Sequence, residues 1–413
     1  MKALQMTDSI PRFAMSKGLA RLRGDTFWGP LACMRYRDVE PPALPTPEWL
    51  RVRTVYGGIC GSDISTLTLH ASTTTSVFTS FPFTFGHENT GVISELGPQT
   101  PDGFEVGQRV VVDPLLSYEQ RGLENAQGFP VNLCQFWEQG AVSEGLMTGF
   151  CRDTGGSWSE EFVAHPSQVL HVPDSVSDEE AVLTEPFAVS LHAVLQNMPA
   201  DDDTVLIIGG GVIGLCTIAA LRGLGSKARI VAITRYPFQA EEARRLGADV
   251  VLGRTRGKAL DQKLLEVLGA RSLKPVLGPN LIVGGAEAVF DCVGSATSFD
   301  QAIRFAGPGG TVVLIGLAGK LDGIDWTPVW LNELTIRGAF AYAMEEWQGE
   351  ELSTMALALR LMAEQKVDLG GLVTHRFALD DYREALTTVT SKGNSGVIKA
   401  VFDFRDYAQI RNG

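Results

Sequence analysis

Hydrophobic and polar positions follow two different patterns along the chain. Up to about residue 185 the apolar runs are short, and Gly or Pro bounds them. The runs LRVRTVY (50–56), TGVISELG (90–97) and GQRVVVDP (107–114) predict strands, the first with one buried face. This spacing indicates an irregular, β-rich domain rather than repeated βα units.

From about residue 186 the pattern changes to strands that alternate with helices. TVLIIG (204–209) and ARIVAI (228–233) predict strands, with a helix through LCTIAALRGLG between them. The same alternation continues through PFQAEEARRLGAD, EAVFDCVG, SFDQAIRFA and TVVLIGL. Such alternation predicts an α/β domain with a doubly wound parallel sheet.

These patterns predict two domains. We expect residues 1–185 and 345–413 to form the β-rich domain and residues 186–344 to form the doubly wound one. The return to the first domain is indicated by an amphipathic helix, ELSTMALALRLMAEQ, followed by THRFALDDYREAL and VIKAVFDF. Three segments have no assigned role: residues 1–30, a long loop or lobe at 115–157, and an apparent insertion at 254–285.

Composition narrows the class of protein. The 413 residues include 35 basic and 48 acidic side chains, a net charge of −13, which disfavours binding to nucleic acid. No signal peptide or run of about 20 apolar residues is present, so we expect a cytoplasmic protein without a membrane span. The six cysteines are unevenly spaced in a long chain, which favours reduced thiols over a disulfide framework.

A glycine-rich fingerprint lies between the first strand and helix of the doubly wound domain. Gly209, Gly211 and Gly214 fit G-x-G-x-x-G, with Val212 and Ile213 between the last two. Glycine permits the turn, lets backbone N–H groups approach a pyrophosphate, and lets helix and strand pack closely. We therefore expect these five residues to bind a dinucleotide; a tight turn without a ligand is the alternative.

The residues that follow the second strand, ARIVAI (228–233), indicate whether the dinucleotide is NAD(H) or NADP(H). Sites for NAD usually place Asp or Glu about 20 residues after the glycines. Here Thr234, Arg235 and Tyr236 stand at that place, so a hydroxyl and a guanidinium replace the carboxylate. Because guanidinium matches phosphate geometry, we expect these residues to favour NADP(H), with NAD(H) possible. The alternative is a solvent-facing arginine in a turn.

Candidate metal ligands follow strand ends in glycine-flanked turns. Cys60 lies in GGICGSD, and His87 and Glu88 lie in FGHENTG. Glu185, in TEPFAVSLHAV, is a further carboxylate. Thiolate, imidazole and carboxylate are zinc ligands, and a catalytic site keeps one position open. Each residue alone has an ordinary structural explanation, and it is their joint occurrence ahead of a dinucleotide fold that favours a metal site.

The chain resembles the medium-chain dehydrogenase/reductase superfamily, most closely its zinc-dependent alcohol and polyol dehydrogenases. The resemblance covers roughly residues 45–402 and implies a β-rich, GroES-like catalytic domain beside a Rossmann domain. The motifs that carry it are GICGSD, GHENTGVI, GQRVVVDP, TEPFAVSLHAV, VLIIGGGVIGL, RRLGAD, DCVGS, PGGTVVLIGL and KVDLGGLVTHRF.

The resemblance also implies roles for individual residues. Cys60, His87 and Glu88 would bind one catalytic zinc ion, and Glu185 would bind it directly or through the water of the metal. Ser62 would relay the substrate's proton, and Asp63 would orient the ligands. A homodimer or homotetramer is implied as well.

Three departures from the family pattern stand out. Ser65 occupies the place of a relay histidine, and nearby His70 receives no role. Only Cys134 and Cys151 lie in the lobe where relatives often hold a structural zinc, so we expect that metal to be absent. The acidic residue of the second Rossmann strand is replaced, which agrees with NADP(H).

We therefore expect a zinc-dependent oxidoreductase that transfers hydride between an alcohol or polyol, or the matching aldehyde or ketone, and NADP(H) or NAD(H). Two alternatives remain open: a zinc-free enone or quinone reductase of the same superfamily, and a non-catalytic NADP(H)-binding protein. The small-molecule substrate itself is left open.

Overall fold

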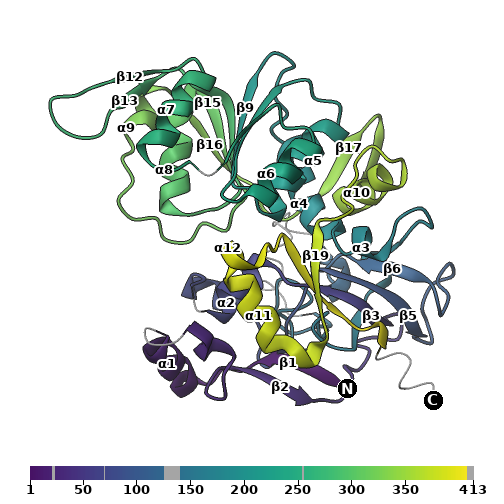
Figure 1. Ribbon diagram of the computed structural model, residues 1–413. Helices are drawn as coiled ribbons and strands as arrows, with labels where there is room; N and C mark the ends of the chain where they lie inside the picture. The colour runs from purple at the N-terminus through teal and green to yellow at the C-terminus, as the bar shows by residue number, and fades with distance from the viewer. Residues whose placement is uncertain (21–23, 69, 125–139, 254, 407–413) are drawn as a thin grey trace. The chain divides into compact units, whose positions relative to one another are not determined.

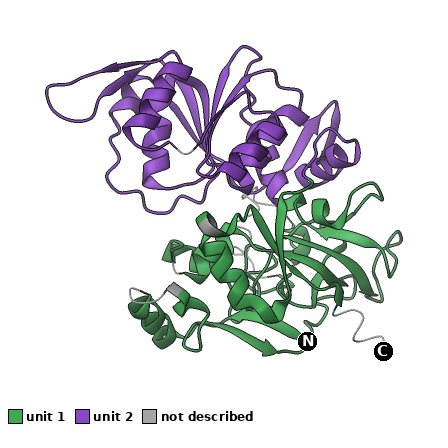
Figure 2. Cartoon of the chain, in the orientation of Figure 1, with its two compact units in different colours: residues 1–185, 370–413 green, residues 186–369 purple. Residues whose placement is uncertain are grey.

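A computed structural model describes residues 1–20, 24–68, 70–124, 140–253 and 255–406 of the chain. The chain divides into two compact units (Figures 1 and 2). The first comprises residues 1–185 and 370–413, and the second comprises residues 186–369. Among the described residues, no helix combines the length and apolar character needed to cross a membrane.

A seven-stranded sheet forms the centre of the first unit. Its order is β19-β20-β3-β5-β6-β8, with β7 also paired to β3, and every pairing except β19 with β20 is antiparallel. Side chains on β3 alternate in burial, as the sequence predicts for a strand with one buried face. The strands are β3 (Leu50–Gly58), β5 (Asn89–Leu96), β6 (Arg109–Val112), β7 (Glu161–Ala164), β8 (Val169–His171), β19 (Val373–Phe377) and β20 (Lys399–Asp403).

The N-terminal segment, which the sequence left unassigned, adds a small sheet and a helix to this unit. The sheet has the order β2-β1-β4, and its strand β1 contributes Leu4 and Met6 to a buried cluster. The remaining strands and the helices of the unit are β1 (Lys2–Met6), β2 (Met34–Asp38), β4 (Phe83–Thr84), α1 (Ile10–Leu19), α2 (Gly61–Leu67), α3 (Asp178–Ala181), α11 (Tyr382–Thr390) and α12 (Lys392–Ser395).

The second unit contains a six-stranded parallel sheet of order β11-β10-β9-β14-β15-β16. The order reverses between β9 and β14, which confirms the predicted doubly wound fold. Figure 1 shows α5 and α6 on one side of this sheet and α7, α8 and α9 on the other. The strands are β9 (Thr204–Ile208), β10 (Arg229–Ile233), β11 (Val250–Leu252), β14 (Ala286–Asp291), β15 (Ala306–Leu314) and β16 (Thr335–Gly338). The helices are α4 (Thr184–Leu195), which begins in the first unit, α5 (Val212–Gly223), α6 (Pro237–Arg245), α7 (Lys258–Val267), α8 (Ala296–Phe305), α9 (Thr327–Leu331) and α10 (Thr354–Ala363).

The segment predicted as an insertion has two different parts. Helix α7 buries Leu260 and Leu264 in the core of the sheet, so it belongs to the fold. The hairpin that follows, β12 (Arg271–Leu273) with β13 (Leu281–Val283), has an exposed tip at Val276 and Leu277.

The second boundary between the units differs from the predicted one. Residues 345–369, which the pattern assigned to the first domain, lie in the second unit as the end of the hairpin β17 (Met344–Trp347) with β18 (Glu350–Ser353), helix α10 and a short turn. Their contacts explain this placement, because Glu345 accepts a 2.5 Å hydrogen bond from His192 of α4 and Asp368 pairs with Arg245 of α6 at 3.0 Å. An amphipathic period shows that α10 is buried on one face but does not indicate its partner.

Candidate metal centre and dinucleotide loop

The candidate ligands Cys60, His87 and Glu88 lie together, where β3 ends and β5 begins. Cys60 follows β3 and is the N-cap of α2, whereas His87 and Glu88 come just before β5. The antiparallel register opposes Gly57 of β3 to Asn89 of β5, which brings the two turns together. One ligand atom of each of the three residues lies within 4.8 Å of the others.

Asp63 and Ser62, both on the first turn of α2, contact this cluster. Asp63 Oδ2 accepts a hydrogen bond from the backbone N–H of Cys60 at 3.0 Å, and its Oδ1 lies 3.3 Å from His87 Nδ1. Ser62 Oγ lies 3.4 Å from His87 Nε2. A carboxylate this close to Nδ1 favours a proton on that nitrogen, which would leave Nε2 as the ligand atom.

Burial and neighbouring charges shift the pKa values of His87 and Glu185. Burial alone lowers the pKa of His87, but the charges of Asp63 and Cys60 outweigh this effect and raise the pKa well above its ordinary value. Glu185, at the first turn of α4, is 8% exposed, and its burial raises its pKa to about 7. Glu185 feels the charges of His87, Glu88 and Lys399, but it is not one of the three residues whose ligand atoms lie within 4.8 Å.

Lys399 is a member of the site that the sequence analysis missed. Its ammonium forms an ion pair with Glu88 and donates to the backbone carbonyl of Ile59 at 3.3 Å, and both charged side chains are buried. Strand β20 carries Lys399 beside β3, with Val401 opposite Gly58. The available signal was a single lysine inside the apolar run VIKAVFDF, because a lysine in a buried strand requires a partner.

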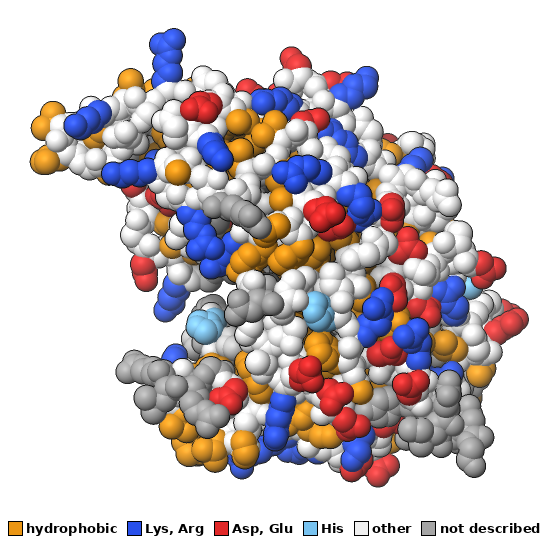
Figure 3. Space-filling view, viewed as in Figure 1, with side chains coloured by type: hydrophobic (Ala, Val, Ile, Leu, Met, Phe, Trp, Pro, Cys, Tyr) orange, Lys and Arg blue, Asp and Glu red, His pale blue; other side chains and the backbone are white. Residues whose placement is uncertain are grey.

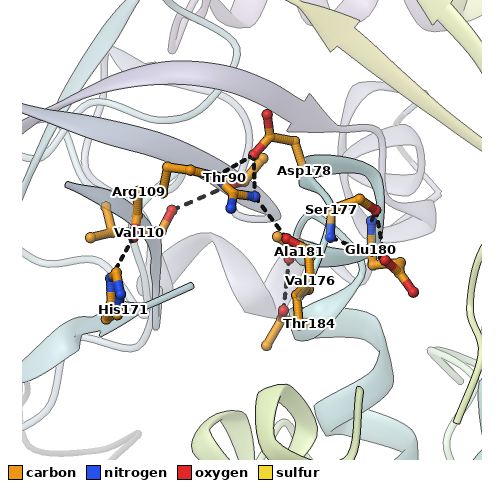
Figure 4. Close-up of polar contacts among 10 residues, drawn as sticks. All are labelled: Thr90, Arg109, Val110, His171, Val176, Ser177, Asp178, Glu180, Ala181 and Thr184. Atoms are coloured by element: carbon orange, nitrogen blue, oxygen red, sulfur yellow. Dashed lines mark hydrogen bonds and ion pairs between the residues drawn. The ribbon is translucent and has the colours of Figure 1, made fainter. Parts of the chain in front are cut away.

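The peptide before Glu185 is fixed by polar contacts within the first unit (Figure 4). Arg109 of β6 donates to Asp178 at 2.7 Å and to the carbonyl of Val176 at 2.8 Å. Ser177 caps α3 through the backbone N–H of Glu180 at 3.2 Å, and Thr184 donates to the carbonyl of Ala181 at 2.7 Å. These bonds fix the chain just ahead of Glu185.

The residues present fit a divalent cation. Cys60, His87 and Glu88 supply a sulfur, a nitrogen and an oxygen, the donor types that zinc prefers. Glu88 Oε1 is buried and has no hydrogen-bond partner within the described part of the chain, and Glu185 and Asp63 add further negative charge. A bound cation would satisfy this oxygen and offset the excess of carboxylates over the single ammonium of Lys399.

Other residues discussed from the sequence lie apart from this cluster or outside the described residues. His70 is exposed, with Nδ1 2.9 Å from Thr68 Oγ1. Cys151 is buried and donates from Sγ to the carbonyl of Ser143 at 3.6 Å, whereas Cys134 lies outside the described residues. The lobe around Cys151 contains the buried Arg121, which donates to four backbone carbonyls.

The glycine-rich loop of the second unit has the geometry that its fingerprint predicts. Gly209 adopts φ +109°, and a Cβ on Gly214 would lie 1.8 Å from the Gly209 carbonyl oxygen. Gly211 is the N-cap of α5, and a Cβ there would have nothing within 4 Å. The loop is therefore tight where helix and strand pack and open where a phosphate would approach the helix N-terminus, with Val212 and Ile213 as the first helical residues.

The end of β10 presents no carboxylate. Thr234 is 3% exposed, and its Oγ1 has no hydrogen-bond partner among the described residues. Arg235 is exposed and its guanidinium lies 5.4 Å from the centre of the Tyr236 ring. Gln239 fixes the turn by accepting the backbone N–H groups of Arg235 and Tyr236 at 3.1 and 3.3 Å.

Comparisons with known sequences match both units. The alcohol dehydrogenase GroES-like domain matches residues 46–174, and the zinc-binding dehydrogenase domain matches residues 212–356. L-idonate 5-dehydrogenase of Vitis vinifera is 30% identical over 381 residues, covering 88% of this chain and 91% of the relative. Sorbitol dehydrogenase of Arabidopsis thaliana is 29% identical over 88% of this chain and 92% of its own length.

Solved structures show the same fold. 2R,3R-butanediol dehydrogenase from Bacillus subtilis superposes with a TM-score of 0.70 at 24% identity, covering 97% of this chain and 99% of that one. A protein described as a zinc-binding dehydrogenase, from Sinorhizobium meliloti 1021 and bound to NADP, gives 0.71 at 24% identity over 97% and 98% of the two chains. The chain belongs to the zinc-dependent alcohol and polyol dehydrogenases of the medium-chain dehydrogenase/reductase superfamily and is an oxidoreductase of the alcohol dehydrogenase type.

Proposed function

We propose that the protein transfers hydride between NADP(H) and an alcohol or polyol, or the matching aldehyde or ketone, at one catalytic zinc site per chain. Cys60, His87 and Glu88 hold the metal, and Glu185 contacts it directly or through water. The first unit is the catalytic domain and residues 186–369 bind the dinucleotide. The observation that carries this proposal is the buried cluster of three ligand atoms within 4.8 Å, backed by Asp63.

The chain's own residues have separate tasks in this reaction. When bound, zinc supplies Lewis-acid polarisation of the substrate oxygen, and the nicotinamide accepts or supplies the hydride. Asp63 holds His87 through Nδ1 and Cys60 through its backbone N–H. Ser62, half-buried and 3.4 Å from His87 Nε2, transfers the proton between the substrate hydroxyl and solvent.

Metal analysis and turnover of matched cysteine variants test the zinc site. We expect one zinc per chain in the wild type and in Cys33→Ala, which removes another buried cysteine of the same unit. Cys60→Ala should lose both zinc and turnover while binding NADPH as before, because its loop lies in a different unit from the glycine-rich loop. Full activity in metal-free Cys60→Ala would exclude the scheme.

The preference for NADP(H) rests on Thr234, Arg235 and Tyr236 at the end of β10. A substrate screen run in parallel with NADP⁺ and NAD⁺, extending over polyols, diols and secondary alcohols, tests it. We expect the higher kcat/KM with NADP⁺, and a higher value with NAD⁺ would contradict the proposal.

Self-association into a homodimer or homotetramer is also proposed. Strand β16 ends the order of the six-stranded sheet, and the nearby Trp330 and Phe340 are 68% and 49% exposed. An open strand edge flanked by apolar side chains favours pairing with another chain. Light scattering coupled to gel filtration would reveal a monomer if this is wrong.

A further inference from the structure

A cavity in the second unit lies beside the carboxyl end of β11, the strand that pairs with β10. Its volume is about 270 Å³, and it is bounded by helix α6, strand β11 with Gly253 after it, and helix α7. Doubly wound sheets bind their ligands at this edge. Pockets that enclose a drug-sized ligand measure about 300–1,000 Å³, so this cavity suits one substituent of a dinucleotide rather than the whole molecule.

The charged side chains that line the cavity are both cations, although the chain as a whole carries a net charge of −13. Arg244 of α6 donates to the carbonyl of Ala240 at 3.2 Å, and Lys263 of α7 donates to Thr255 at 3.2 Å. Neither forms an ion pair with the described residues. The adjacent Arg245 differs, because it pairs with Glu242 at 2.7 Å and with Asp368 at 3.0 Å. Two uncompensated cations beside a cavity favour an anionic ligand.

Thr234 is a buried polar residue directly behind Gly253, one of the residues that line the cavity. A Cβ built on Gly210 would meet the methyl group of Thr234 at 2.8 Å, whereas one built on Gly253 would meet its Oγ1 at 3.3 Å. The methyl group therefore faces the glycine-rich loop, and the hydroxyl faces Gly253, which lines the cavity. This hydroxyl is buried and has no hydrogen-bond partner in the described part of the chain, so a ligand oxygen that reached it past Gly253 would complete its hydrogen bonding.

We infer that this cavity is the subsite for the 2′-phosphate of the adenosine ribose, with Arg244 and Lys263 as its recognition cations and Thr234 as its hydroxyl donor. The inference rests on the proposed use of NADP(H), and it adds two residues from α6 and α7 to those at the end of β10. Guanidinium binds a phosphate monoester through paired hydrogen bonds, and the lysine adds a point charge. Discrimination against NAD(H) then depends on Arg244 and Lys263, which lie 10 and 29 positions after Thr234 in the sequence.

Calorimetric binding of 2′,5′-ADP and 5′-AMP tests the subsite without turnover. We expect Arg244→Gln and Lys263→Gln each to weaken 2′,5′-ADP binding about 10- to 100-fold and to leave 5′-AMP binding unchanged, because only the former carries the 2′-phosphate. Arg244→Lys should retain part of the affinity. The control Arg245→Gln changes the next residue of the same helix and should alter neither affinity.

The outcomes separate this inference from the proposed function. If the wild type prefers 2′,5′-ADP and neither Arg244→Gln nor Lys263→Gln reduces that preference, the subsite is wrong and the use of NADP(H) stands. An equal loss for both nucleotides would assign Arg244 and Lys263 a structural role and also overturn the subsite. If the wild type binds 5′-AMP as tightly as 2′,5′-ADP, the proposed preference for NADP(H) fails, and the subsite fails with it.

Discussion

Arg121 and Lys399 are buried cations of the first unit, and the groups that bind them differ. In the lobe, the Arg121 guanidinium donates to the backbone carbonyls of four residues, at 3.3, 3.0, 3.2 and 2.7 Å for Leu116, Val142, Ser143 and Gly145. At the metal cluster, the Lys399 ammonium pairs with the carboxylate of Glu88. Carbonyl dipoles thus surround the first cation, whereas the second faces a carboxylate that a metal ion would share.

This difference distinguishes Arg121, which stabilises the lobe, from Lys399, whose role depends on the metal site. The four carbonyls that accept from Arg121 belong to the lobe and not to the metal cluster, so we expect this cation to stabilise the lobe whether or not a metal is bound. Lys399 instead competes with the metal for one carboxylate, and its contribution to stability therefore depends on the metal.

The largest effect is expected for Arg121→Met. The variant removes the Arg121 donor from four buried carbonyls, of which only that of Ser143 also accepts from the Cys151 thiol among the contacts described above. Because an unsatisfied buried acceptor costs about 1–3 kcal/mol, we expect a loss on the order of 4 kcal/mol after relaxation. Urea unfolding with zinc and with a chelator measures this loss, which should be the same in both. A loss of unfolding free energy that depends on zinc would contradict the distinction between Arg121 and Lys399.

Lys399→Met should destabilise the metal-free protein by about 3–5 kcal/mol, because it leaves the Glu88 carboxylate buried without a counter-ion. With zinc bound the loss should be smaller, since the cation supplies the missing charge, and zinc affinity should rise. Unfolding with and without zinc, together with competition against a chromophoric chelator, measures both quantities. Equal losses in the two states would mean that Lys399, like Arg121, is purely structural.

Gly58→Ala tests the position of Glu88 while Lys399 stays in place. A Cβ at Gly58 would lie 2.1 Å from Glu88 Oε2, so the carboxylate must move, at a cost of about 1–3 kcal/mol and with weaker zinc binding. The control is Gly61→Ala, where a Cβ meets nothing within 4 Å. Unchanged zinc affinity in Gly58→Ala would remove Glu88 from the ligand set.

The smallest effect is expected for Arg109→Met, which removes a cation that is 32% exposed at its side chain. A half-exposed ion pair contributes about 1 kcal/mol or less, so thermal unfolding should shift little and zinc affinity should not change. A loss as large as that of Arg121→Met would show that burial does not decide the effect of a cation in this unit.

The sequence was sufficient to predict the fold class and to select Cys60, His87 and Glu88, which lie near one another in the structure. Cys60 stands in a glycine-flanked turn after a predicted strand, and His87 stands in a glycine-flanked turn before the next one. The fingerprint at Gly209 follows an apolar strand, so local patterns carry this information. The pairing of Lys399 with Glu88 could not be read, because it depends on which strand becomes the neighbour of β3 across more than 300 residues of chain. The same reason explains the placement of residues 345–369, whose partners are α4 and α6.

The cavity near Thr234 could not be predicted from the sequence either. Thr234 and Arg235 were identified as substitutes for an acidic residue, but Arg244 and Lys263 lie on two helices whose spacing only the folded unit defines. Sequence distance from the glycines locates the end of β10, and it contains no information about which neighbouring helices present cations to it.

Strand β20, which bears Lys399, has a consequence for synthesis on the ribosome. The backbone N–H of Ile59 bonds to the carbonyl of Ala400 at 3.0 Å, directly ahead of Cys60, so the turn with the first ligand is completed by one of the last segments to be translated. The growing chain therefore leaves the pairing positions of β3 at residues 56–58, and the Glu88 carboxylate, without their partners from β20 while residues 186–369 emerge. We therefore expect the second unit, residues 186–369, to complete its fold before the first unit does.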